Sequence, residues 1–268
     1  MTVQLERLER GEGARRHLLL VHGFTGAKDD FEDHIDDLAA LGWHVVAPDL
    51  RGHGQSDHPE GEHAYSLAIF ADDIAALADD LGWDTFVLLG HSMGGMIAGA
   101  YAIAHPERLA GLVLMDTSHG PVELGERDVI EGARSVVREG GMKALVEVMR
   151  ESGGVLDTPA HQRVVAERPG YAEMGERKSL ESADDMFLAM TAELFTQPDR
   201  LGDLAKLDVP ALVIVGEQDE AFIEPSQRMA GAIPGARLEV IADAGHSPQF
   251  ENPSAWLAVL SAFLEEVD

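Results

Sequence analysis

Residues 85–104 read TFVLLGHSMGGMIAGAYAIA, and this stretch guides the interpretation of the whole chain. An apolar run typical of a buried strand leads into small apolar residues that are compatible with a helix. Between them lies a G-x-S-x-G pattern that centres on Ser92. At a sharp strand-to-helix turn a serine hydroxyl projects from the backbone, and the glycines leave room for the strained turn. The stretch therefore predicts Ser92 as a nucleophile; the alternative is a buried serine in a tight turn.

The same alternation of apolar runs and helical patterns extends along the chain, as in βαβ units around a parallel sheet. Strands are expected at 17–21, 44–47, 85–89, 111–115, 211–215 and 237–241, with an edge strand at 3–10. Helices are expected at 30–41, 67–81, 93–105, 225–232 and 253–266. The fold class predicted from this pattern is α/β.

Residues 120–207 break the alternation, because they contain no convincing strand pattern. Short amphipathic helices are predicted at 127–139, 142–151, 159–167 and 182–195. Glycine and proline pairs such as Gly140-Gly141 separate them. The chain is therefore expected to have a core of residues 1–119 and 208–268, interrupted by a helical cap at 120–207.

The composition limits the class of protein and its location. The chain has 268 residues and no cysteine, which excludes a disulfide framework, a thiolate zinc site and a cysteine nucleophile. No apolar run approaches the ~20 residues that span a bilayer. Residues 1–7 show no basic region followed by an apolar one, so no signal peptide is indicated. A cytoplasmic enzyme is the simplest interpretation.

The formal net charge is −28, from 20 basic and 48 acidic residues. Such a field repels phosphate, which argues against nucleic acid and anionic membranes as partners. The charge is interpreted as a solvated surface, with adaptation to high salt or a preference for cationic substrates as alternatives. The histidines are scattered without a metal-binding pair on one helix, and no phosphate-binding or dinucleotide motif is present. No metal and no cofactor are expected, and the oligomeric state is left open.

A serine nucleophile needs a base, and the base needs a group that orients it. Asp219 follows the apolar run 211–215, and His246 lies in a loop after the last expected strand. In open α/β sheets the loops at the carboxyl ends of the strands share one crevice. Ser92, His246 and Asp219 are therefore expected to converge, with His246 as base. Three other carboxylates compete with Asp219 for the role of the acid, namely Glu217, Glu220 and Asp116.

Acyl transfer also requires hydrogen-bond donors for the developing oxyanion. The loop His22 to Gly26 follows an apolar strand, and the backbone N–H of Phe24 can point into the crevice. Met93 follows the nucleophile at the start of a helix and offers a second N–H. One such donor contributes on the order of 10²–10³ in rate. The histidines beside these motifs, His22, His53 and His91, are interpreted as structural.

Together these motifs resemble those of the α/β-hydrolase superfamily. The resemblance is carried by Gly90 to Gly95, His22-Gly23, Asp49 to Ser56, His105 to Arg108, Gly216 to Asp219 and Gly245-His246. It implies a mostly parallel sheet of eight strands flanked by helices, with a helical cap inserted after the sixth strand. It also implies Ser92 as nucleophile, His246 as base, Asp219 as the acid, and the Phe24 and Met93 amides as the oxyanion hole.

Details within the motifs narrow the expected activity. Dehalogenases and epoxide hydrolases of this fold use an aspartate nucleophile, whereas this chain has Ser92. The loop at His22 to Gly26 resembles the menaquinone-pathway lyase, which carries an arginine where this chain has Met96. The chain is thus expected to be a carboxylesterase acting on a small-molecule ester.

Several alternatives to the predicted carboxylesterase activity stay open. They are a carbon–carbon bond hydrolase, a lactonase or a lyase with the same triad, and a triad-bearing ligand receptor. If the chain is an esterase, the residues expected to contact the substrate are Met149, Phe187 and Phe222.

Overall fold

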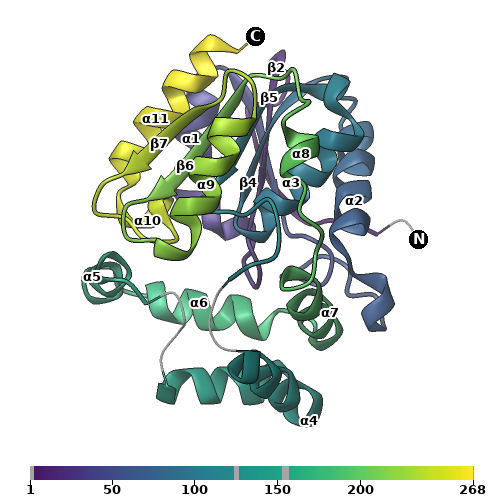
Figure 1. The fold of residues 1–268 in the computed structure, drawn as a ribbon, viewed down its shortest axis with the longest axis vertical. Helices are drawn as coiled ribbons and strands as arrows, with labels where there is room; N and C mark the ends of the chain where they lie inside the picture. Colours follow the sequence, from purple (N-terminus) through teal and green to yellow (C-terminus); the bar gives the residue numbers. More distant parts are fainter. Residues whose placement is uncertain (1–2, 124–126, 153–156, 268) are drawn as a thin grey trace.

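The computed structural model describes residues 3–123, 127–152 and 157–267 (Figure 1). A single sheet of seven strands, in the order β1-β3-β2-β4-β5-β6-β7, runs through the molecule. The strands are β1 (Arg7–Arg10), β2 (Arg16–Val21), β3 (Trp43–Pro48), β4 (Phe86–His91), β5 (Leu109–Met115), β6 (Ala211–Gly216) and β7 (Arg237–Ile241). β1 pairs antiparallel with β3, and all the other pairs are parallel. The predicted α/β class is confirmed.

Helices cover both faces of the sheet, because successive strand residues point to opposite sides. In β2, Leu18 and Leu20 pack with one cluster of buried side chains, and Leu19 and Val21 pack with the other. The first cluster includes side chains from α1 (Glu32–Ala40) and α11 (Pro253–Glu266). The second includes side chains from α2 (Leu67–Asp80), α3 (Met93–Ala104), α8 (Leu201–Leu204) and α9 (Glu220–Ala232). This three-layer arrangement fixes the strand ends from which the site is built.

The sheet differs from the expectation at its N-terminal edge. The resemblance implies eight strands, but the described residues form seven, and the predicted edge strand at 3–10 is reduced to Arg7–Arg10. Ahead of β1, the carbonyls of Gln4 and Glu6 accept hydrogen bonds from Asp57 and Asp49 in the chain that follows β3. This short segment is therefore held by a loop instead of a further strand. As a result, the helical block follows the fifth described strand and not the sixth.

Of the helices between β5 and β6, the first four, α4 to α7, form what is here called the helical insertion. They are α4 (Arg127–Ser152), α5 (Pro159–Glu167), α6 (Tyr171–Leu180) and α7 (Asp184–Leu194). Gly141 interrupts α4 with a φ of 69°, at the glycine pair predicted to separate two helices. In Figure 1 the insertion lies below the sheet. The boundaries 1–119, 120–207 and 208–268 stay a prediction.

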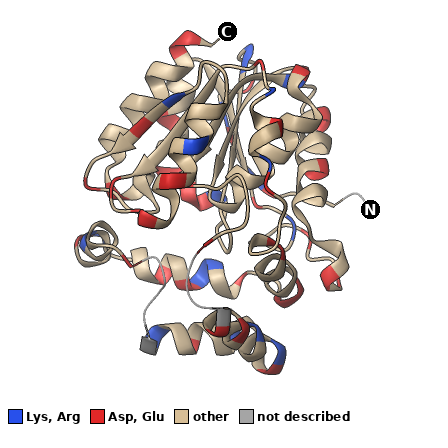
Figure 2. Ribbon diagram, viewed as in Figure 1, with Lys and Arg blue, Asp and Glu red and all other residues tan. Residues whose placement is uncertain are grey.

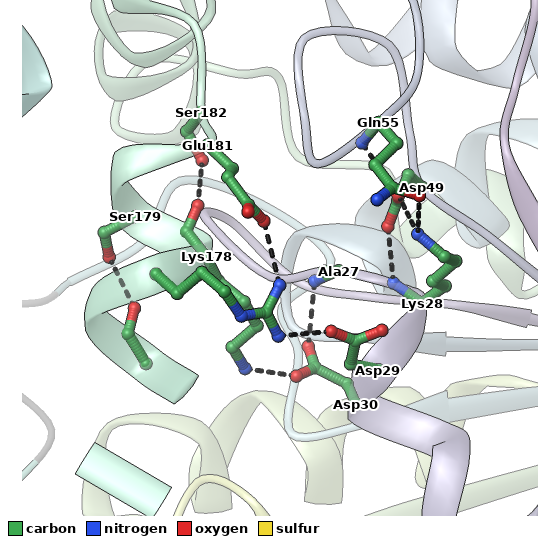
Figure 3. Close-up of polar contacts among 12 residues, drawn as sticks. Ala27, Lys28, Asp29, Asp30, Asp49, Gln55, Lys178, Ser179, Glu181 and Ser182 are labelled. Atoms are coloured by element: carbon green, nitrogen blue, oxygen red, sulfur yellow. Dashed lines mark hydrogen bonds and ion pairs between the residues drawn. The ribbon is translucent and has the colours of Figure 1, made fainter. Parts of the chain in front are cut away.

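Ion pairs fasten the insertion to the loop after β2. Lys178 of α6 pairs with Asp30, and Arg177 pairs with Asp29 in the short 3₁₀ helix Lys28–Phe31 (Figure 3). Arg168, just after α5, pairs with Asp33 at the start of α1. Near the end of β3, the carbonyl of Gly52 accepts a hydrogen bond of 2.8 Å from the backbone of Ala183. The insertion therefore covers the edge at which the parallel strands end.

Acidic residues occur in the core helices and in the insertion alike (Figure 2), and the chain has 48 of them against 20 basic residues. This excess of acidic residues gives the net charge of −28. Among the described residues, no helix is both long enough and apolar enough to cross a membrane.

Candidate active site

Ser92 lies between the last residue of β4 and the first residue of α3, in a strained turn with φ 55° and ψ −119°. The two flanking glycines make this turn possible. A Cβ atom on Gly90 would lie 2.1 Å from the carbonyl oxygen of Gly94, and one on Gly94 would lie 2.4 Å from that of Val21. The Ser92 amide donates to the Met115 carbonyl at 2.8 Å, which ties the turn to β5. Strain of this kind is typical of functional positions.

The three predicted residues lie in one hydrogen-bonded chain. Ser92 Oγ is 2.9 Å from Nε2 of His246, and Nδ1 of His246 is 2.8 Å from Oδ2 of Asp219. Because an ionised carboxylate can only accept, Nδ1 carries the proton and Nε2 is free to accept from the serine hydroxyl. Among the competing acids, Glu217 and Glu220 are exposed, whereas Asp219 is buried.

The loop that carries His246 is held by further polar contacts. Oε2 of Glu251 accepts hydrogen bonds from the amides of Gly245 and Ser247, on either side of the histidine. The carbonyl of His246 accepts from Nε2 of His91, at 2.6 Å. Glu251 was not predicted, because a glutamate five residues beyond His246 matches no local pattern. These contacts fix the backbone to which the imidazole of His246 is attached.

The protonation of His91 explains how it can donate. Burial, assisted by the neighbouring His246, lowers the pKa of His91 to about 3. The ring is therefore neutral near pH 7, with its proton on Nε2, and Nδ1 has no partner in the described part of the chain. Burial also raises the pKa of Glu251, against the two amides that favour its charged form.

The two predicted oxyanion donors have free amides. Neither the Phe24 nor the Met93 backbone N–H has an acceptor within the described residues. The loop at Phe24 is fixed by His22, whose Nδ1 donates to the Gly23 carbonyl at 2.8 Å and whose Nε2 accepts from Leu50 at 3.0 Å. Met93 is the first residue of α3, so its N–H is one of the unpaired donors of a helix N-terminus.

The candidate substrate contacts separate into two groups. Phe222 is buried, with its ring centroid 4.9 Å from that of His246. Phe187 of α7 is buried and stacks on Phe24 at 5.2 Å, so the insertion reaches the oxyanion loop. Met149 is 44% exposed on α4, and no contact with the triad is found in the described residues.

Residues 16–145 and 155–253 match the model of a family described as the alpha/beta hydrolase fold. The chain belongs to this family. The match covers most of the core and of the insertion, so the resemblance to α/β hydrolases is confirmed.

Individual relatives carry different activities in their names. A Bacillus subtilis protein named as a candidate 2-succinyl-6-hydroxy-2,4-cyclohexadiene-1-carboxylate synthase is 29% identical, over 97% of this chain and 94% of its own. A thermophilic esterase from Thermogutta terrifontis is 32% identical with a TM-score of 0.79, over 98% of this chain and 94% of that one. The enol-lactonase of Burkholderia xenovorans shares the fold, with a TM-score of 0.85 at 24% identity, over 98% and 97% of the two chains.

Proposed function

We propose that this family member is a serine hydrolase that cleaves carboxylic esters through an acyl-enzyme intermediate on Ser92. The observation that carries the proposal is the continuous chain from Ser92 Oγ through His246 to Asp219, with links of 2.9 and 2.8 Å. A nucleophile, a base and an orienting acid within hydrogen-bond reach are the parts that acyl transfer needs.

The chemistry follows from which atom holds each proton. Nε2 of His246 takes the Ser92 proton as Oγ attacks the ester carbonyl carbon, and the amides of Phe24 and Met93 stabilise the resulting oxyanion. When the intermediate collapses, the carbon–oxygen bond breaks and Nε2–H protonates the leaving alcohol. Water, deprotonated by the same nitrogen, then attacks the acyl carbon, and the proton returns to Ser92 as the acid leaves. Asp219 remains ionised throughout and stabilises the imidazolium.

The side chains beside the triad favour an apolar group on the substrate. Phe222 lies against His246, and Phe24 and Phe187 stack beside the proposed oxyanion hole. Aromatic walls with a few placed polar groups are typical of small-molecule sites. The esterase among the solved structures, 32% identical over nearly the whole chain, supports an ester as the substrate.

A second candidate is a lyase that uses the same triad to abstract a proton. The Bacillus subtilis relative, aligned over almost the whole of both chains, favours it. In this chain Met96 is buried and its sulfur accepts from Nε2 of Gln197 at 3.0 Å. This buried, uncharged position offers no cation for a carboxylated substrate. We therefore place ester cleavage first, with cyclic esters included.

The test is steady-state hydrolysis of p-nitrophenyl esters from acetate to dodecanoate, by wild type, Ser92→Ala and the exposed control Ser254→Ala. Turnover that depends on chain length, persists in Ser254→Ala and falls by about 10³-fold or more in Ser92→Ala supports the proposal. Full activity in a folded Ser92→Ala contradicts it. Absent wild-type turnover, with Ser92 still labelled by an organophosphonate, favours the lyase.

A further inference from the structure

Asp116 is a buried carboxyl group that the proposed mechanism does not use. It directly follows β5, is 0% exposed and has a left-handed backbone with φ 45°. Its Oδ1 accepts a hydrogen bond of 2.8 Å from the Gly216 amide, at the end of β6. Its Oδ2 accepts no hydrogen bond from any of the described residues. A buried ionised oxygen without a donor is costly, so the state of this group needs an explanation.

The surroundings of Asp116 are acidic. One ligand atom from each of Asp116, Asp219 and His246 lies within 4.8 Å of the other two. The carboxyl of Glu251 adds a further unfavourable interaction with negative charge at Asp116. No arginine or lysine pairs with Asp116 in the described residues. Two buried carboxyl groups this close do not both ionise readily, so one proton is shared between them.

The hydrogen-bond partners decide which carboxyl keeps the proton. Asp219 receives the charge-assisted hydrogen bond from Nδ1–H of His246, which favours its ionised form. Asp116 receives only one amide. Burial, and then the charge of Asp219, raise the pKa of Asp116 well above its usual range. A proton on Oδ2 turns this unpartnered acceptor into a donor, and the carboxylate of Asp219, with an oxygen within 4.8 Å of an oxygen of Asp116, is the charged acceptor beside it.

We propose that Asp116 is a neutral carboxylic acid that donates a hydrogen bond from Oδ2 to Asp219, and is a positioning residue for the proposed triad. Its role in catalysis rests on the proposed function, whereas its protonation does not. With this bond, Asp219 has donors from two sides, which holds the carboxylate in the orientation that meets Nδ1 of His246. The left-handed backbone at Asp116 is one that aspartate and asparagine tolerate better than other non-glycine residues.

A metal ion is the other way to explain three such groups with ligand atoms within 4.8 Å of one another. Metal binding is disfavoured by His246, because both of its ring nitrogens already take part in hydrogen bonds. Nδ1 carries the proton donated to Asp219, and Nε2 faces the hydroxyl of Ser92. No imidazole lone pair is left to ligate an ion between Asp116 and Asp219.

The decisive experiment compares the thermal midpoint of wild type and Asp116→Asn as a function of pH. An acid with a raised folded pKa stabilises the fold below the unfolded pKa, and this stability is lost as pH rises toward the folded value. The Asp116→Asn variant has no carboxyl group at this position, so its stability shows no such loss with rising pH. The midpoint of Asp116→Asn relative to wild type should therefore rise by about 3–5 °C per pH unit from about pH 4 upward, until the folded pKa is reached.

Asp84→Asn, at an exposed position, is the control and should show no such slope. A pH-independent difference between wild type and Asp116→Asn, or one of opposite sign, overturns the proposal. So does added zinc that stabilises wild type but not Asp116→Asn, because this result assigns a metal site. None of these outcomes depends on ester hydrolysis, so the proton assignment can fail while the proposed activity holds, and the reverse.

Activity and spectroscopy test the positioning role. Asp116→Asn keeps a donor toward Asp219 and an acceptor for Gly216, so kcat should stay within about 3-fold of wild type. Asp116→Ala loses both and should lower kcat about tenfold or more at nearly unchanged KM. The infrared difference between wild type and Asp116→Asn at neutral pH should contain the C=O stretch of a protonated acid. Its absence, or equal kcat for the asparagine and alanine variants, contradicts the proposal.

Discussion

The proposed base, His246, is fixed through its ring and its backbone together. Asp219 binds the ring, His91 binds the carbonyl, and Glu251 binds the amides of both neighbours. Side chains in an active site must be held within fractions of an ångström, and a supporting shell of hydrogen bonds achieves this. The position of the imidazole is therefore a property of a network and not of the triad alone.

Replacing Glu251 tests the amide contacts. Glu251→Ala leaves two amides without their acceptor and should cost about 1–3 kcal/mol in the free energy of unfolding, with a lower kcat. Glu251→Gln keeps an acceptor oxygen and should therefore lose less stability and less activity than Glu251→Ala. The measurements are urea unfolding and ester turnover, beside the exposed control Glu265→Ala. If Glu251→Ala matches the control in both, the contacts have no positioning role.

The buried neutral ring of His91 predicts a pH dependence of stability. Its folded pKa of about 3 lies below the value near 6.5 of an exposed histidine. The stability that it contributes is present above about pH 6.5 and is lost as pH falls toward 3, because the unfolded chain binds the proton first. His91→Gln should therefore flatten the fall in the thermal midpoint between these two pH values. A fall of equal size in wild type and variant contradicts this assignment.

At the scale of elements, Lys178 connects the insertion to both sides of the candidate site. Its side chain is 12% exposed and pairs with Asp30, whose Oδ2 accepts from Ala27 at 3.4 Å in the loop after Phe24 (Figure 3). Its ammonium also lies 5.9 Å from the ring of Phe250 in α10 (Pro248–Glu251), the helix that supplies Glu251. Burial opposes the charge of Asp30, but Lys178 and then His22 bring its pKa below the usual value.

Removing Lys178 should be costly, because a buried carboxylate is left without its partner. Lys178→Met should destabilise the fold by about 3–5 kcal/mol, and adding Asp30→Asn should recover much of the loss. The exposed pair of Lys206 and Asp203 provides the control, since Lys206→Met should change stability by only about 0–1 kcal/mol. Urea unfolding of these three variants and wild type forms the test. Equal losses in the Lys178 and Lys206 variants would rule out a structural role for the buried pair.

The elements with a strong local pattern were predictable from the sequence. β7 and α11 have the predicted bounds, because each combines an apolar period with a clear start signal or turn. α6 was not predicted, since Tyr171 is its only buried side chain and ion pairs hold it in place. The triad residues were named from motifs, whereas the contacts of Glu251 and Asp116 arise only from tertiary packing. Charged side chains that act through such contacts leave no periodic signal.

At the scale of the whole molecule, the net charge of −28 is the dominant feature. Acidic residues occur throughout the core and the insertion (Figure 2) and outnumber the basic ones, 48 to 20, so like charges repel one another. Salt screens such repulsion beyond a Debye length of about 8–10 Å at 0.1–0.15 M. The thermal midpoint should therefore rise from low salt to about 0.15 M and then level off. A steady rise to molar salt contradicts this and indicates adaptation to high salt.

The proposed mechanism requires an acyl group on Ser92 during turnover, and intact-protein mass spectrometry detects such an adduct. Wild type is quenched with acid during hydrolysis of a p-nitrophenyl ester, beside Ser92→Ala, and the modified peptide is mapped. We expect one acyl adduct, on the peptide that contains Ser92, and none in the variant. Turnover without an adduct, or an adduct on another residue, contradicts the proposed mechanism.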